Sequence, residues 1–343
     1  MAVNNELIKD DLYEAVNGGW LKTAKIPDDK PATGGFNDLV NEIDKQLMDD
    51  FDAYATGKEK SDDSRFNEMI KLYRLAKKFD WRKKVGPQPL KRMLASVENL
   101  NSYEDYQSQW KNWILAGMPS PISFDIDADM KNATVYALFA SSPSLILPDK
   151  SYYEAEKKAQ HDQLLQLWSS MVEALMDKLG YSKEEAKKII DDAIKFDALL
   201  APNVKSAEEA ADYSKMYNPQ TVAELASATD QLDIAAIIKQ LVGEEPEKVI
   251  VTEPEYFKAL NKILQDNFEL FKNWALIRVI RENASYLDDE MREINGRYGR
   301  ALSGSKKPVS QSKFAFYLAR DMFSQVAGDY YGKKYFGPQA KAD

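Results

Sequence analysis

The chain has 343 residues, of which 44% are apolar and 29% charged, so it can bury a substantial core and is too apolar for a disordered chain. Its formal net charge is −9, and Lys and Arg are interspersed with Asp and Glu, which argues against a surface that follows nucleic-acid phosphates. The absence of cysteine excludes disulfides, thiolate metal sites and cysteine catalysis.

The first eleven residues are polar and acidic, without a basic segment or an apolar stretch. No later window approaches the ~18 apolar residues that a membrane-spanning helix needs. We therefore expect no membrane partner and no nucleic-acid partner, and a cytoplasmic location. A secreted parent whose signal peptide had been removed would have the same features.

Apolar residues recur mainly at helical spacing, as in Phe66, Met69, Ile70 and Tyr73. The segment 122–129 instead alternates between apolar and polar residues, and a second β-prone run covers residues 134–139. The chain is thus predicted to be mainly α, a multi-helix lobe with a small β-hairpin near residues 122–139.

Asp125, Asp127 and Asp129 within this alternating segment are spaced like the first ligands of an EF-hand calcium loop. With Asp125 at position 1, Met130 stands where the loop needs Gly and Tyr136 where it needs a bidentate Glu. The outward face of a β-strand explains the spacing better.

The clearest helix begins at Ser182, which forms a capping-box pattern with Glu185 ahead of apolar residues at helical spacing. Gly180 would end the preceding helical run, and Pro202 follows this helix closely. The pattern predicts a helical hairpin.

The only histidine is His161, in the helical run AQHDQLL. A zinc site of the HExxH type needs two imidazoles one helical turn apart and a carboxylate that acts on the bound water. The chain cannot form such a site, and a lone histidine beside Asp162 on a helix is more often a surface or capping residue than a triad member. We therefore expect no metal ligand and no catalytic residue in this chain.

The segment DDLYEAVNGGWLKTAKIP, which begins at Asp10, resembles the opening of the neprilysin-type zinc metalloendopeptidases, a family that includes bacterial PepO-like oligopeptidases. Further matches follow in the family's order and span essentially the whole chain. They are KLYRLAKK at Lys71, LPDKSYYE at Leu147, LGYSKEEAKKIIDDAIKFDALLA at Leu179, MYNP at Met216, VIVTEPEYF at Val249 and RYGRALSG at Arg297.

The resemblance implies an intact protein with two mainly helical lobes around a cavity, with zinc bound by HExxH and a later glutamate in the carboxy-terminal half. The chain would be the amino-terminal, non-catalytic half of a zinc-dependent neutral endopeptidase that hydrolyses oligopeptides. Residues 1–25 would form an arm that packs on the carboxy-terminal catalytic half, and residues 26–343 a helical lobe that restricts substrate access.

The expected partners are therefore oligopeptide substrates and the catalytic half. The expected cofactor is zinc in the intact parent, with none bound by this chain. The parent would be an enzyme, whereas the chain by itself is expected to be inactive because it lacks HExxH.

The resemblance points to Phe36 and Asn37 as residues that line the substrate cavity, since Phe36 matches a cavity aromatic and Asn37 stands where neprilysin has Asp. Ordinary packing beside the preceding glycine turn is the alternative. Two arginines that hold the carboxyl end of the substrate in neprilysin align with Ala32 and Val40, which makes a carboxyl clamp of that kind doubtful.

Residues 283–286, Asn-Ala-Ser-Tyr, spell the family's substrate-binding Asn-Ala-x-Tyr pattern. The family's segment lies on an edge strand, which presents its amides to a peptide, whereas these residues lie in a helical run. We interpret them as part of a helix and not as a substrate site.

Two other functions are compatible with the residues. The first is a complete helical binding or interaction module without enzymatic activity. The second is a carboxylate-based hydrolase, which would require two acidic groups that converge in one pocket.

Overall fold

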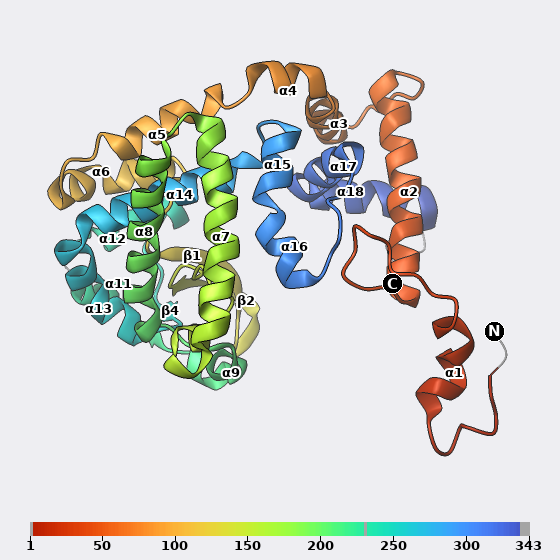
Figure 1. The fold of residues 1–343 in the computed structure, drawn as a ribbon, viewed down its shortest axis with the longest axis horizontal. Coiled ribbons are helices and arrows are strands. Elements are labelled where there is room, and N and C mark those ends of the chain that lie inside the picture. Colours follow the sequence, from red (N-terminus) through yellow and green to blue (C-terminus); the bar gives the residue numbers. More distant parts are fainter. Residues whose placement is uncertain (1–2, 230–231, 337–343) are drawn as a thin grey trace. The chain divides into compact units, whose positions relative to one another are not determined.

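The computed structural model describes residues 3–229 and 232–336, and the chain forms two compact units. Unit 1 consists of Met1–Lys84 and Gly296–Asp343, and unit 2 of Val85–Asn295. Most described residues are helical, which confirms the predicted mainly α fold. Figure 1 shows the elements of both units.

Unit 1 is helical throughout its regular structure. Its elements are α1 (Leu12–Leu21), α2 (Gly35–Thr56), α3 (Ser64–Ala76), α4 (Phe79–Val85, whose last residue belongs to unit 2), α16 (Arg297–Ser303), α17 (Gln311–Met322), α18 (Ser324–Tyr331) and a π-helical turn (Gly332–Phe336).

Aromatic side chains form the core of unit 1, where α2, α3 and α17 meet. The Phe51 ring lies edge-on to Phe66, Tyr73 and Phe316, with ring centroids 5.3–6.2 Å apart. All four side chains are buried, which brings the two segments of unit 1 into one core although they are more than 200 residues apart.

Unit 2 combines a helical layer with a small sheet. Its helices are α5 (Lys91–Glu98), α6 (Tyr103–Leu115), α7 (Lys158–Leu179), α8 (Lys183–Leu200), α9 (Ala207–Ala211), α10 (Tyr213–Met216), α11 (Val222–Ala228), α12 (Ile234–Val242), α13 (Pro254–Asp266), α14 (Phe268–Ala284) and α15 (Asp289–Asn295). Its strands are β1 (Ser123–Asp129), β2 (Asn132–Ser141), β3 (Pro219–Gln220) and β4 (Val249–Val251).

Helix α14 lies at the centre of unit 2. Phe271, Trp274, Ile277 and Ile280 are all buried, and apolar residues occupy nearly every side of the helix. A helix that is apolar all round is stable only when other elements cover it. Here α5, α7 and α8 pack against it, and α7 and α8 run side by side (Figure 1).

The predicted helical hairpin is confirmed in α7 and α8. Ser182 Oγ accepts a hydrogen bond from the Glu185 amide at 3.2 Å, and the Glu185 carboxylate accepts one from the Ser182 amide at 2.9 Å. Gly180 has φ 92°, a left-handed conformation that ends α7 and favours glycine.

The predicted β-hairpin is confirmed as β1 and β2, which pair antiparallel with Ile126 opposite Leu138. The sheet has the order β1-β2-β4-β3, in which β4 pairs parallel to β2. Strands β3 and β4 are too short for their sequence pattern to predict.

The predicted outward face of β1 holds for Asp125 and Asp127 but is wrong for Asp129, which is only 2% exposed. Lys248 approaches its carboxylate to 2.6 Å, and this contact holds the pKa of Asp129 at about 2. Ile126, which lies between the two exposed aspartates in the sequence, is itself 56% exposed.

Asn283 and Ala284 form the last turn of α14, and the Asn283 side chain donates a hydrogen bond to the Val279 carbonyl within that helix. The helical interpretation is therefore confirmed for Asn283 and Ala284, whereas Ser285 and Tyr286 form the turn that follows the helix. Among the described residues, no helix is both long enough and apolar enough to cross a membrane.

The substitution Ser182→Ala tests the contribution of the α8 cap. It removes the acceptor for the Glu185 amide, and we expect the free energy of unfolding to fall by about 1 kcal/mol. Urea denaturation followed by circular dichroism measures the change. Ser96→Ala, in the exposed interior of α5, is the matched control and should shift stability by less than ~0.5 kcal/mol. Equal effects of the two substitutions would contradict a capping role.

Candidate functional site

Phe36 and Asn37, the residues assigned to the substrate cavity, lie in the first turn of α2 and are both exposed. Phe36 is 87% exposed, so it is not held in a packed core. Its side chain is free to contact another chain or a ligand. The cavity-lining role of the two residues stays a prediction.

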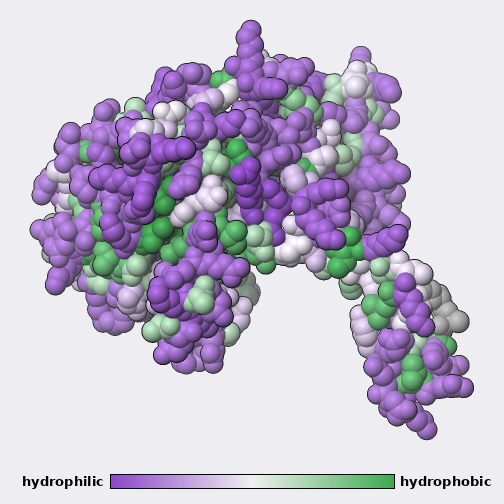
Figure 2. Space-filling model, in the orientation of Figure 1, coloured by the Kyte–Doolittle hydropathy of each residue, from purple (hydrophilic) through white to green (hydrophobic). Residues whose placement is uncertain are grey.

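Large apolar side chains reach the surface repeatedly in residues 12–40, and we call these side chains together the amino-terminal apolar surface. Figure 2 shows green, apolar spots among hydrophilic residues on the part of the chain that carries α1. Its members are Leu12, Tyr13, Val16, Leu21, Ile26, Phe36, Leu39 and Val40. Single exposed apolar residues need no explanation, whereas such a concentration in one segment is typical of a surface that another chain covers.

The residues that the structure describes do not fit a zinc site. His161 Nδ1 lies 2.9 Å from Asp162 Oδ1, and its ring is edge-on to Tyr153. Within residues 3–229 and 232–336, no group of three or more histidines and carboxylates is arranged to hold a metal ion. No zinc chemistry is therefore assigned to them.

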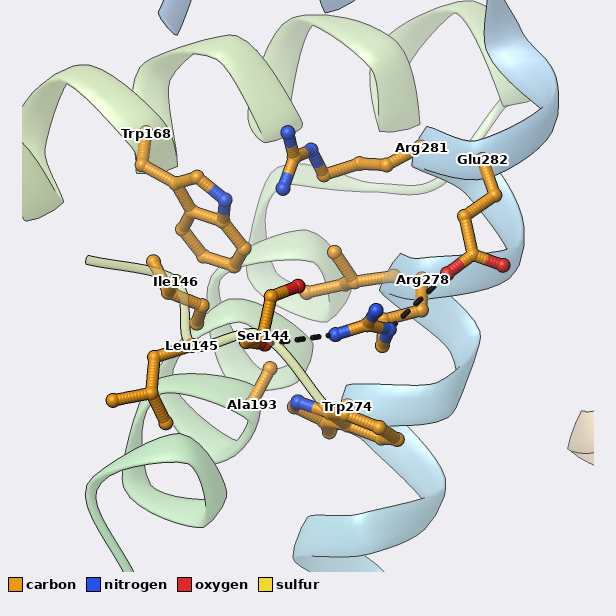
Figure 3. Close-up of a pocket in the computed structure, with 10 residues that line it drawn as sticks. Ser144, Leu145, Ile146, Trp168, Ala193, Trp274, Arg278, Arg281 and Glu282 are labelled. Carbon is orange, nitrogen blue, oxygen red and sulfur yellow. Dashed lines mark hydrogen bonds and ion pairs between the residues drawn. The ribbon is translucent and has the colours of Figure 1, made fainter. Parts of the chain in front are cut away.

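A hollow of about 230 Å³ lies in unit 2 between the loop after β2 and helices α7, α8 and α14 (Figure 3). The residues that line it are Ser144, Leu145, Ile146, Trp168, Ala193, Trp274, Ile277, Arg278, Arg281 and Glu282.

One face of α14 supplies half of this lining. Trp274, Arg278 and Arg281 follow one another at intervals of four and three residues, which places them on one side of a helix. The Arg278 guanidinium stacks over the Trp274 ring at 4.8 Å from its centroid. It also donates to the Ser144 carbonyl at 3.1 Å and pairs with Glu282 at 3.2 Å (Figure 3).

A buried carboxyl group, that of Asp197 on α8, holds the loop that forms one wall of the hollow. Asp197 is 1% exposed and accepts hydrogen bonds from the Ile146 amide, at 3.1 Å, and from the Tyr153 hydroxyl. Burial raises the pKa of Asp197 to about 6, against the opposing effect of these donors.

Trp168 on α7 also lines the hollow and is 1% exposed. Its indole N–H has no hydrogen-bond acceptor within the part of the chain that the structure describes. Figure 3 shows this nitrogen on the side of the ring that faces the Arg281 guanidinium. The hollow therefore presents donors that face one another.

Comparison with known proteins decides the family. The amino-terminal model of peptidase family M13 matches residues 8–343. The chain belongs to peptidase family M13. The resemblance to the neprilysin-type endopeptidases is thereby confirmed.

Two M13 relatives and one solved structure illustrate the match. The neutral endopeptidase of Lactococcus lactis subsp. lactis is 37% identical over 338 residues, which are 98% of this chain and 53% of that protein. Neprilysin-2 of Drosophila melanogaster is 23% identical over 338 residues, covering 93% of this chain and 43% of its own length. The crystal structure of PepO from Lactobacillus rhamnosis HN001 superposes with a TM-score of 0.88 at 30% identity, over 98% of this chain and 53% of PepO.

The chain thus spans about half the length of the M13 proteins that it matches and corresponds to their amino-terminal part. The motif matches that indicated the family are spread over both units.

The hollow in unit 2 was not predicted from the sequence. The spacing of Trp274, Arg278 and Arg281 was a visible signal, but only the fold shows that residues 144–146 close over that face of α14.

The substitution Asp197→Asn tests the buried carboxyl. In the wild type, the pKa of Asp197 is about 6, above the ordinary aspartate pKa of 3.8. Between pH 3.8 and pH 6 the folded chain therefore keeps a proton on this carboxyl that the unfolded chain has lost. The resulting stabilisation is complete below about pH 4 and is lost as pH rises through about 6, on the order of 3 kcal/mol in total. Urea unfolding between pH 4 and pH 7 should show this slope for the wild type and not for Asp197→Asn.

Asp191→Asn, on the same helix with a half-exposed side chain, is the matched control and should keep the wild-type slope. An Asp197→Asn variant whose stability varies with pH as the wild type does would show that Asp197 ionises normally in the folded chain.

Proposed function

We propose that this chain is the amino-terminal half of a zinc-dependent endopeptidase that hydrolyses oligopeptides, and that it restricts substrate access without breaking bonds itself. The observation that carries the proposal is the M13 match over residues 8–343, with relatives named neutral endopeptidase of which the chain covers about half. The zinc and its catalytic residues would then lie in the other half of the intact protein.

The amino-terminal apolar surface supports the proposal that a partner chain docks on this one. Fully burying a single Leu, Val or Phe side chain contributes about 1.5–3 kcal/mol. Covering the members that lie within the arm formed by residues 1–25, such as Leu12, Tyr13 and Leu21, would give a stable association with little help from polar contacts. We assign this arm to the carboxy-terminal catalytic half.

In the proposed division of labour, residues 26–343 form the wall that selects short peptides. Phe36 would contribute an apolar contact to a bound peptide, since no core of unit 1 encloses its side chain. Asn37, one residue further along α2, could donate and accept hydrogen bonds with the peptide backbone.

A cytoplasmic location of the protein stays part of the proposal, and fractionation of the native cells tests it.

Production of the chain alone and of the protein encoded by its complete gene tests the proposal. Residues 1–343 should bind less than about 0.1 zinc per chain and cleave no oligopeptide, because one histidine cannot build the site. The complete product should bind about one zinc and lose cleavage on chelation. Elemental analysis and chromatography of peptide digests provide the measurements.

Cleavage by residues 1–343 that a chelator abolishes would refute the proposal. A gene that ends after residue 343, with no peptidase activity in its product, would favour the alternative of a complete helical interaction module.

The substitution Phe36→Ala in the intact enzyme tests the cavity wall. Loss of one apolar contact with the peptide should raise KM roughly fivefold and leave kcat within about twofold. Tyr213→Ala, which removes another highly exposed aromatic side chain, is the matched control and should change neither value. Steady-state kinetics with one fluorogenic oligopeptide is the measurement, and an unchanged KM for Phe36→Ala would exclude Phe36 from the substrate path.

A further inference from the structure

We propose that the hollow in unit 2 binds a small carboxylate that carries an apolar group. This inference does not depend on the proposed peptidase function, because every residue that carries it lies in unit 2 of this chain. It rests on an unsatisfied buried donor, on the charge around it and on the size and lining of the hollow.

The unsatisfied donor is the indole N–H of Trp168. The side chain is almost completely buried, and within the described residues no acceptor reaches its nitrogen. A buried donor without an acceptor is costly, and proteins retain few of them. The indole nitrogen faces the Arg281 guanidinium across the hollow (Figure 3). An acceptor placed between these two groups would bind both.

The buried carboxyl group beside the hollow does not serve the Trp168 N–H. Asp197 accepts hydrogen bonds from the Ile146 amide and the Tyr153 hydroxyl, and within the described residues no acceptor reaches the Trp168 nitrogen. A ligand acceptor that enters the hollow would satisfy this donor.

The charge of the hollow favours an anion. Arg278 and Arg281 bring two guanidinium groups to its lining, against the single partly exposed carboxylate of Glu282. Guanidinium groups bind carboxylates through paired, charge-assisted hydrogen bonds. Glu282 pairs with Arg278, and the buried Asp197 carboxyl also interacts with Arg278. The Arg281 guanidinium faces the Trp168 indole nitrogen (Figure 3), so we place the ligand carboxylate between these two groups.

The size and the remaining lining indicate a small ligand with an apolar group. A volume of about 230 Å³ is below the range of about 300–1,000 Å³ that is typical of sites for drug-sized molecules. Ile146, Ala193 and Ile277 supply apolar walls beside the donors. A branched chain of four to six carbons attached to a carboxylate satisfies both requirements.

Such a carboxylate has two sources, a free short-chain acid or the carboxyl end of a peptide. Three probes distinguish them. 4-Methylpentanoate represents the free acid, N-acetyl-leucine represents a peptide end, and N-acetyl-leucinamide has the same apolar group without the charge.

Titration calorimetry with the complete 343-residue chain tests the proposal. We expect 4-methylpentanoate or N-acetyl-leucine, or both, to bind with a dissociation constant below about 1 mM, and the amide to bind at least tenfold more weakly. Preference for N-acetyl-leucine identifies a peptide end as the ligand, and preference for 4-methylpentanoate identifies a free acid. Absence of binding by both carboxylates, or equal binding of the amide, would overturn the proposal.

Two substitutions locate the site. Trp168→Phe removes the N–H and keeps an aromatic ring, and we expect about tenfold weaker binding. Trp110→Phe, at another fully buried tryptophan of unit 2 outside the hollow, is the matched control and should leave the affinity unchanged.

Arg281→Met keeps an extended side chain and removes its charge, at a position that is partly exposed. This substitution should also weaken binding at least tenfold. It provides the test of the site if the Trp168→Phe variant does not fold. Unchanged affinity in both Arg281→Met and a folded Trp168→Phe would place the ligand elsewhere and overturn the assignment.

Discussion

The packing of α14 against α8 is the interaction on which unit 2 depends. Buried apolar residues lie around most of the circumference of α14, and α5, α7 and α8 pack against it and cover them. Phe196 on α8 contacts both Phe271 and Trp274 of α14 through tilted rings 5.4–5.6 Å apart. Large aromatic side chains in such contacts supply most of the area that the core buries.

The same packing creates the hollow. The α14 face that carries Trp274 and Arg278 is directed at the loop after β2, and Asp197 of α8 holds that loop through the Ile146 amide. Asp197 is thus a structural carboxyl group, although its pKa is strongly shifted. A shifted pKa often marks a catalytic group, but here the donors around the carboxyl account for its burial.

Features that depend on a local sequence pattern could be predicted from the sequence alone. The α8 cap, the glycine that ends α7 and the β-hairpin follow from residues within a few positions of one another, and the structure has all three. Features that depend on distant partners could not be predicted. Asp129 was assigned to the outside of its strand because its partner Lys248 is 119 residues away in the sequence, and the hollow depends on a contact between Ile146 and Asp197.

The most direct test of the proposed division between the two halves is reconstitution from separate chains. Purified residues 1–343 are mixed with a separately produced carboxy-terminal half, and zinc content, association and oligopeptide cleavage are measured for each component and for the mixture. The account predicts zinc only in the carboxy-terminal half, a stable complex of the two, and size-restricted cleavage only in that complex. A carboxy-terminal half that by itself cleaves the same peptides with the same size limit would contradict the role assigned to this chain.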